Sequence, residues 1–152
     1  MKRFRLLLIV VAAVACSGKG LIGPWTPSIA GAWRFSYSGM SGALQGVTVT
    51  CTTGALDFTL THSGTAFSGV QLGSSRVMCS AQGTTVVDAV LNAETIVNGT
   101  INGSSISFRL GTVPGQHTGT VSGTSMSGTA RWLFTEGNTT LTLNGQFTAA
   151  KL

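Results

Sequence analysis

From Gly31 to the C-terminus, hydrophobic and polar side chains alternate in short runs separated by glycine-containing turns. In the first run Trp33, Phe35 and Tyr37 alternate with polar residues, and later runs repeat this period. A period of two is that of a β-strand, whose successive side chains point to opposite faces. Turn pairs such as Asn102-Gly103 join neighbouring runs and are typical of hairpins. The pattern therefore predicts strands joined by short turns.

This pattern predicts an all-β fold, a single antiparallel meander β-barrel of about eight to ten strands, with a β-sandwich as the alternative. Glycines at strand positions favour the barrel, because they permit the sharp bends of a small closed sheet. One stretch, residues 84–94, is ambiguous. Its valines and leucine follow a short helical spacing, whereas its β-branched residues favour a strand. We expect a strand or a short helix there.

The first fifteen residues have the pattern of a secretory signal peptide. Lys2, Arg3 and Arg5 precede an apolar run over residues 6–15. A run of about ten residues suits a signal peptide and is too short to cross a hydrocarbon core of about 30 Å. The sequence therefore predicts export of the mature chain and removal of residues 1–15.

Small residues at Ala13 and Ala15 stand directly before Cys16. This arrangement resembles the lipobox of bacterial lipoproteins. The resemblance implies cleavage before Cys16 and acylation of its sulfur and new amino terminus, which would hold the protein on a membrane of the bacterial cell envelope. Ser17 resembles the sorting pattern for the outer membrane, facing the periplasm or the cell surface. The alternative is an ordinary signal peptide followed by a bystander cysteine.

Glycine and proline are frequent in residues 16–30, which opposes regular structure. We therefore divide the chain into a signal peptide (1–15), a lipidated cysteine with a flexible tether (16–30) and a β-barrel domain (31–152). Charge adds little to this picture. Three of the nine basic residues lie in the leader, so six basic and four acidic residues remain, and the basic ones are scattered. Nucleic-acid binding is not expected, because it requires clustered Lys and Arg.

Two cysteines, Cys51 and Cys79, remain if Cys16 is acylated. An even pair in an oxidising compartment predicts a disulfide bond. Neither cysteine has the CxxC or CxxH spacing of a metal site. We therefore expect a disulfide between strands, no metal and no cofactor.

The first strand opens with Gly31-Ala32-Trp33. This motif resembles the G-x-W signature of lipocalins and related calycin barrels. In that family the tryptophan closes the barrel floor, and a basic residue from a late strand packs over it. The resemblance implies a lipocalin-like barrel and makes Arg131, ahead of Lys151, the candidate for that basic residue.

Few residues suit catalysis. His62 lies in a predicted turn and His117 begins a predicted strand, and we expect both at the surface. Asp88 stands between Val87 and Ala89 and is the acid we expect to be most buried. No serine lies in a G-x-S-x-G motif. The sequence therefore predicts no catalytic residues and a protein that is not an enzyme.

Two functions remain open beside a less favoured hydrolase. The first is a barrel whose interior binds a small apolar ligand. The second is a filled barrel that interacts with an envelope protein. An interior cavity of about 300 Å³ or more would favour the first, and dense side-chain packing the second. The expected ligand-lining residues are Trp33, Phe35, Phe58, Phe108, Trp132 and Phe147.

Overall fold

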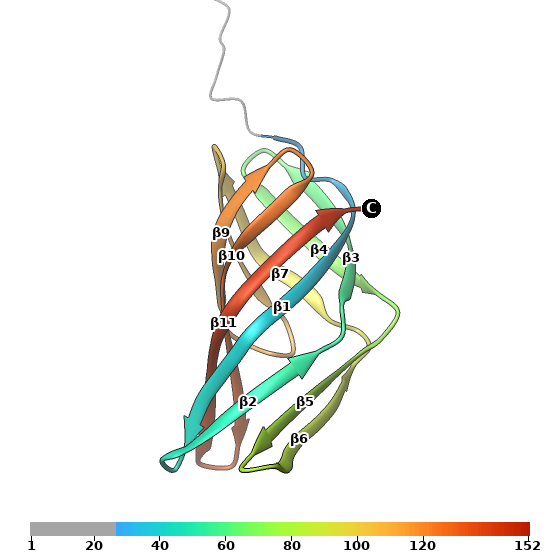
Figure 1. The fold of residues 1–152 in the computed structure, drawn as a ribbon. Coiled ribbons are helices and arrows are strands. Elements are labelled where there is room, and N and C mark those ends of the chain that lie inside the picture. The colour runs from blue at the N-terminus through green and yellow to red at the C-terminus, as the bar shows by residue number, and fades with distance from the viewer. Residues whose placement is uncertain (1–26) are drawn as a thin grey trace, which may run out of the picture.

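A computed structural model describes residues 27–152, and in this part of the chain all regular structure is antiparallel β-strand (Figure 1). The predicted signal peptide, Cys16 and most of the predicted tether lie outside these residues. The ambiguous stretch at 84–94 forms a strand followed by a turn. The eleven strands of the described part are β1 (Gly31–Leu44), β2 (Val47–Thr53), β3 (Leu56–Ser63), β4 (Ala66–Leu72), β5 (Ser75–Ala81), β6 (Thr84–Leu91), β7 (Thr95–Asn102), β8 (Ser105–Leu110), β9 (Gln116–Ser122), β10 (Ser125–Glu136) and β11 (Thr139–Lys151).

Eight of these strands close into a ring in the order β1-β3-β4-β7-β8-β9-β10-β11, and β11 pairs back to β1. The closing pair runs antiparallel from Trp33 opposite Lys151 to Gly42 opposite Leu143. Closure gives both edges of every ring strand a partner along the ring. The prediction of an all-β protein with a single antiparallel barrel is therefore confirmed.

The ring closes over only half the length of the molecule. Strands β7, β8 and β9 have six to eight residues, whereas β1, β10 and β11 have twelve to fourteen. We call the ring the upper half. Below it, the long strands continue and the second part of β1 pairs with β2, which leads to β5 and β6. This lower half is an open sheet in the order β10-β11-β1-β2-β5-β6, and the strands from β2 to β6 depart from a simple meander.

Aromatic side chains fill the upper half because the inward positions of its strands carry most of the large rings. The Phe35 ring centroid lies 5.5 Å from that of Phe58, 5.8 Å from Phe108 and 6.1 Å from Phe147. These are the distances of edge-to-face and offset ring packing. Gly128 of β10 faces Gly119 of β9, and a Cβ on either would overlap the other strand's backbone. The two glycines therefore allow β9 and β10 to approach closely.

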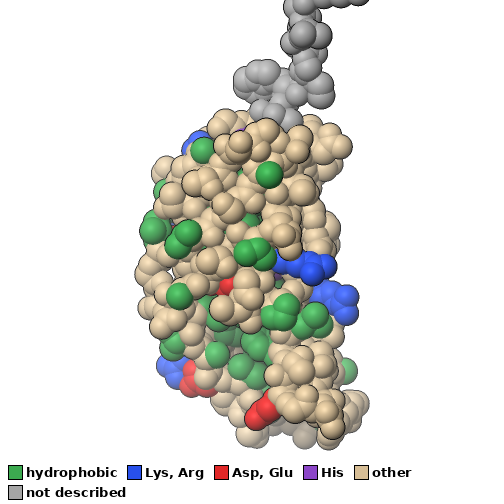
Figure 2. Space-filling view, turned by 180° about the vertical axis from the view of Figure 1, so that it is seen from behind, with side chains coloured by type: hydrophobic (Ala, Val, Ile, Leu, Met, Phe, Trp, Pro, Cys, Tyr) green, Lys and Arg blue, Asp and Glu red, His purple; other side chains and the backbone are tan. Residues whose placement is uncertain are grey.

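Few charged groups lie on the face shown in Figure 2, and many exposed strand positions carry threonine or serine. Threonine pairs bridge neighbouring strands, as in the 3.0 Å hydrogen bond between the hydroxyls of Thr118 and Thr129. Arg34 and Asp57 form an ion pair at 2.8 Å across β1 and β3. Such exposed pairs contribute about 0–1 kcal/mol each, so the buried core stabilises the fold far more.

The packed body begins just before β1. The Ile29 side chain is fully buried, and its carbonyl accepts a 2.8 Å hydrogen bond from the Trp33 indole N–H. Lys151, not Arg131, is the basic residue over Trp33, with its Nζ 5.9 Å from the ring centroid. The expectation of Arg131 was wrong because strand register decides the neighbour: Lys151 pairs with Trp33, whereas Arg131 pairs with Asn144 farther down β11.

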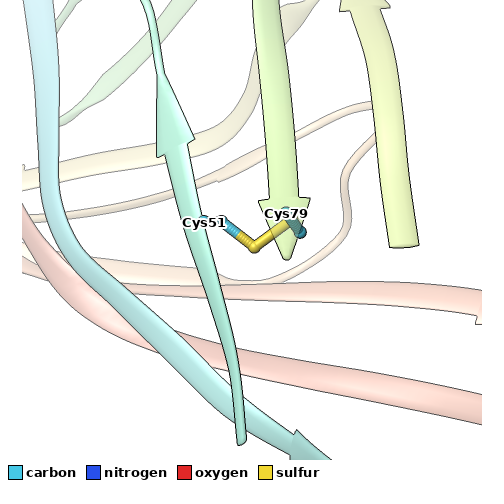
Figure 3. The surroundings of a disulfide bond; sticks show 2 residues. All are labelled: Cys51 and Cys79. Atoms are coloured by element: carbon cyan, nitrogen blue, oxygen red, sulfur yellow. A yellow bond between two sulfur atoms is a disulfide. The ribbon is translucent and has the colours of Figure 1, made fainter. Parts of the chain in front are cut away.

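Cys51 of β2 and Cys79 of β5 form a disulfide bond, which confirms the predicted pairing (Figure 3). The two residues are direct partners across the strands, with their Cα atoms 4.0 Å apart. The bond therefore fastens β5, and through it β6, to the part of the sheet that continues from β1.

We expect the double substitution Cys51→Ser and Cys79→Ser to lower the free energy of unfolding by about 3–4 kcal/mol. The physical reason is the entropy that the unfolded chain regains when a closed loop of this length opens. Urea unfolding monitored by tryptophan fluorescence measures the loss. Reductant should shift the wild-type midpoint toward that of the double variant and leave the variant unchanged; equal midpoints in oxidised wild type and variant would contradict the prediction.

Candidate functional site

The six residues expected to line a ligand cavity do come together in the upper half, where each is at most 1% exposed. However, the four phenylalanines contact one another rather than surround a space, and Trp132 packs against Tyr37 and Phe134. Phe108 lies within 5.9 Å of Phe35, Phe67 and Phe147, measured between ring centroids. Side chains of this size at these distances form a packed core. The upper half is therefore unsuited to holding a ligand among these rings.

His117 lies in this core and not at the surface, so the expectation from sequence was wrong for this residue. It is fully buried because its register on β9 places it opposite the inward-facing Phe108, and the two rings stack at 4.5 Å. The Trp132 indole N–H donates to His117 Nε2 at 3.3 Å. Burial lowers the pKa of His117 to about 4, although the Gly115 carbonyl and Glu94 oppose the shift. The neutral ring therefore serves as a hydrogen-bond acceptor within the core.

Tyr37 packs beside this pair, with its ring centroid 4.8 Å from that of Trp132 and 5.7 Å from that of His117. Burial raises the pKa of the Tyr37 hydroxyl, and the negative charge of Glu94 raises it further. Neither Tyr37 nor His117 can exchange protons readily with a substrate outside the core. His62 instead lies near the surface, where its Nε2 is 2.9 Å from the Gly64 carbonyl oxygen.

The buried acid is Glu94, at 1% exposure, and not Asp88. Asp88 faces outward on β6 and forms an ion pair with Arg76, which lowers the pKa of its carboxyl through hydrogen bonding and charge. Glu94 accepts hydrogen bonds from the backbone N–H groups of Thr95 at 3.0 Å and Thr112 at 2.8 Å, and from the Thr112 hydroxyl. Glu94 therefore holds the connection after β8 against the start of β7. The sequence did not single out Glu94, because it stands at the end of the ambiguous stretch 84–94, where the pattern does not indicate which side chains are buried.

A second buried polar side chain extends this junction between the two halves. Gln71 of β4 accepts from the Glu94 backbone N–H and donates to the Leu91 carbonyl, both at 2.9 Å. Its hydrogen bonds fasten the end of β6 to the ring. The buried side chains of Glu94 and Gln71 therefore have a structural role, which is to hold the connections at the junction of the two halves.

The hollow suited to binding lies in the lower half, where the ring is absent. A groove of about 640 Å³ opens between β6 on one side and the end of the β10–β11 hairpin on the other. Hydrophobic side chains gather on the lower part of the face shown in Figure 2. The groove is lined by Leu44, Val86, Val87, Phe134, Thr135, Glu136, Thr139 and Leu141.

Two consecutive valines, Val86 and Val87, line the same groove, although neighbouring residues of a regular strand face opposite sides. The cause is an irregularity in the β5–β6 pairing. Cys79 pairs with Val87, but the next residue, Ser80, pairs with Thr85, so Val86 has no partner. Such a bulge redirects a side chain locally. The bulge therefore adds a second apolar side chain to the groove wall.

A second hollow of about 530 Å³ lies over β9, β10 and β11 and is lined mainly by polar side chains, among them Gln116, Arg131 and Gln146.

Within residues 27–152, no three His, Cys, Asp or Glu side chains are grouped as metal ligands. No helix in this part of the chain is long and apolar enough to cross a membrane. No protein-family model, curated protein or solved structure matches the chain.

The buried His117 predicts a loss of stability in mild acid. Its pKa is about 4 in the folded protein and about 6.5 in an unfolded chain, so between these values only the unfolded chain binds the proton. The free energy of unfolding should therefore fall by about 2 kcal/mol between pH 7 and pH 5. Urea unfolding at both pH values measures this change.

The variant His117→Leu should lose this dependence on pH, whatever its stability at pH 7. The matched control is His62→Gln, which removes the other histidine and should leave the dependence as in the wild type. A wild-type protein that is equally stable at pH 7 and pH 5 would refute the neutral, buried histidine.

Proposed function

We propose that the protein is a non-enzymatic lipoprotein of the bacterial cell envelope that binds a partner protein through the groove of the lower half. One observation carries this proposal. The phenylalanines that could have lined a ligand cavity pack against one another, while a large hollow lined by both apolar and polar side chains remains where the ring opens. The filled upper half then acts as a rigid support, and the groove acts as the binding surface.

The groove lies at the opposite end of β1 from residues 27–30, which lead into the barrel. Strand β1 begins at Gly31, close to the proposed tether, and ends at Leu44, which lines the groove. Fourteen residues of strand separate the two ends by about 45 Å. A chain acylated at Cys16 would therefore present the groove away from its own membrane, toward other molecules of the envelope.

A small apolar ligand in the same groove is the second candidate. Its support is the groove volume of about 640 Å³, which lies within the usual range of ligand pockets, about 300–1,000 Å³. Leu44, Phe134 and Leu141 supply apolar contacts. Against it, the groove is open along the sheet edge, whereas pockets for small ligands enclose most of the ligand surface.

The anchor is tested by metabolic labelling with a radioactive fatty acid in a bacterial host. We expect label in the wild-type protein and none in Cys16→Ser, because only the first has the thiol that becomes acylated. The matched control, Ser17→Ala, keeps Cys16 and should be labelled. Equal labelling of wild type and Cys16→Ser would reject the lipoprotein.

The groove is tested by photo-crosslinking in intact cells. We expect benzoylphenylalanine at Val87 to give a discrete protein adduct, because this side chain lines the groove. The same group at Thr129, on the outer face of β10, is the control and should give none. Leu141→Asp should abolish the adduct, since it introduces a charge into the groove. An adduct that forms equally from both positions would reject the groove as the binding surface.

Dye binding and crosslinking together distinguish a small ligand in the groove from a partner protein. If a small ligand occupies the groove, N-phenyl-1-naphthylamine should bind the purified protein with saturable fluorescence that Leu141→Asp removes, and Val87 should give no protein adduct. If a partner protein is the occupant, the adduct at Val87 is the signal that Leu141→Asp removes.

A further inference from the structure

We infer that the groove receives an extended segment of a partner polypeptide, which adds to the free edge of β6 as a further strand between β6 and β10. This inference rests on the proposed function and specifies the chemistry of the partner.

The backbone N–H and C=O groups of β5 point alternately toward β2 and toward β6. The Arg76 carbonyl accepts a 3.1 Å hydrogen bond from the Gly54 N–H, on the side of β2. The Cα atoms of Cys51 and Cys79 are 4.0 Å apart, which matches a pair without mutual hydrogen bonds. Cys79 therefore turns its N–H and C=O away from β2 and toward β6, where it pairs with Val87.

The alternation of a strand then fixes the next residues of β6. Val87 and Ala89 turn their backbone groups toward β5, so Asp88 and Val90 turn theirs outward. Within the described residues β6 is the last strand of the sheet, with β5 as its one neighbour. The N–H and C=O groups of Asp88 and Val90 therefore lie on an open strand edge that continues from Val86 and Val87 of the groove wall.

The opposite wall is also a strand edge. Strand β9 covers β10 only as far as Ala130, whereas β11 covers it to Glu136. The Leu133 N–H donates to the Pro114 carbonyl at 2.7 Å, on the side that β9 occupies higher up. By alternation, Thr135 turns its backbone groups to the same side, and Thr135 lines the groove. On this wall the Leu133 N–H is already bonded, so the backbone groups of Thr135 are those that remain for an incoming strand.

A single extended segment fits this space better than a second copy of the protein. A strand that enters between two edges needs both of its own edges free. The β6 strand of a second copy is already bonded to β5 along one edge, so it cannot lie between the walls. The segment from the proposed cleavage site is too short, because the twelve residues from Cys16 to Pro27 extend at most about 40 Å and precede the end of β1 that is far from the groove.

The side chains of the walls indicate what such a segment carries. One face would lie against Leu44, Val87 and Phe134, which requires apolar residues at alternate positions. The acid at the rim, Glu136, has no ion-pair partner within the described residues, so a Lys or Arg near one end would complement it. Strand β6 has no Lys or Pro that would block pairing at its edge.

The test uses the purified mature protein with a small set of peptides of the form acetyl-Lys-X-Thr-X-Thr-X-Thr-amide, where X is Val, Ile, Leu or Phe. Amide hydrogen exchange is followed by NMR. Without peptide, the amides of Asp88 and Val90 should exchange fast, and those of Val87 and Ala89 slowly. A bound peptide should slow Asp88 and Val90 by at least about tenfold, because strand addition gives backbone groups on that edge a hydrogen-bond partner.

The variant Val90→Pro removes one outward N–H and leaves the bonds to β5 intact, as edge strands permit. It should weaken peptide binding about tenfold, because a hydrogen bond is lost and the ring obstructs the incoming strand. Val90→Thr is the matched control, since it keeps the N–H and should bind as the wild type does. Equal binding by Val90→Pro and Val90→Thr would overturn strand addition.

Two further outcomes also overturn the inference. One is that no member of the set binds at up to about 1 mM, a concentration that detects contacts of only about 4 kcal/mol. The other is a dimer in sedimentation that Val90→Pro dissociates, which would make a second copy the occupant. If the crosslink at Val87 persists in either case, the proposed function stands and only the strand addition fails.

Discussion

The structure depends on β1, which pairs with one strand along one edge and with two different strands along the other. Along one edge β1 pairs with a single strand, β11, from Trp33 to Gly42. Along its other edge it pairs first with β3 and then, from Met40 onward, with β2. The sheet closes into a ring only where β1 pairs with β3, because β3 belongs to the ring and β2 does not. Closure is therefore restricted to the half of the molecule that contains β3. The open lower half, its groove and its two free edges all follow from this division.

The closed half is rigid for a chemical reason beyond its burial of apolar surface. The buried Trp132 requires an acceptor for its indole N–H, and His117 supplies one only while it remains neutral. Glu94 and Gln71 then fasten the connections at the lower end of the ring. Glu94, Gln71 and the Trp132 indole are thereby hydrogen-bonded within the described chain, whereas the Tyr37 hydroxyl is buried without a hydrogen-bond partner. The partner site that we propose lies in the open half instead.

Much of the fold could be predicted from the sequence because alternation reports directly on burial. The inward faces around Phe35, Phe58 and Phe147, the strand at 84–91 as one of two alternatives, and the disulfide all followed from local pattern or cysteine count. The position of the groove could not be predicted in the same way, because it depends on which strands pair with each other. Alternation fixes that Lys151 and Arg131 leave the core, but only register decides that Lys151 meets Trp33.

Strand pairing also decides where the groove lies, and it leaves β6 as an edge strand within the described residues. Sequence alone cannot show that β6 ends a sheet, and natural edge strands usually carry Lys or Pro that prevent unwanted pairing. Strand β6 instead carries exposed Val86 and Val90, at 44% and 60% exposure, and its one charge, Asp88, is neutralised by Arg76. An edge of this kind is a liability unless it has an occupant. The disulfide joins β5 to β2 and so holds this wall in place, which would lower the entropy cost of the strand addition that we propose.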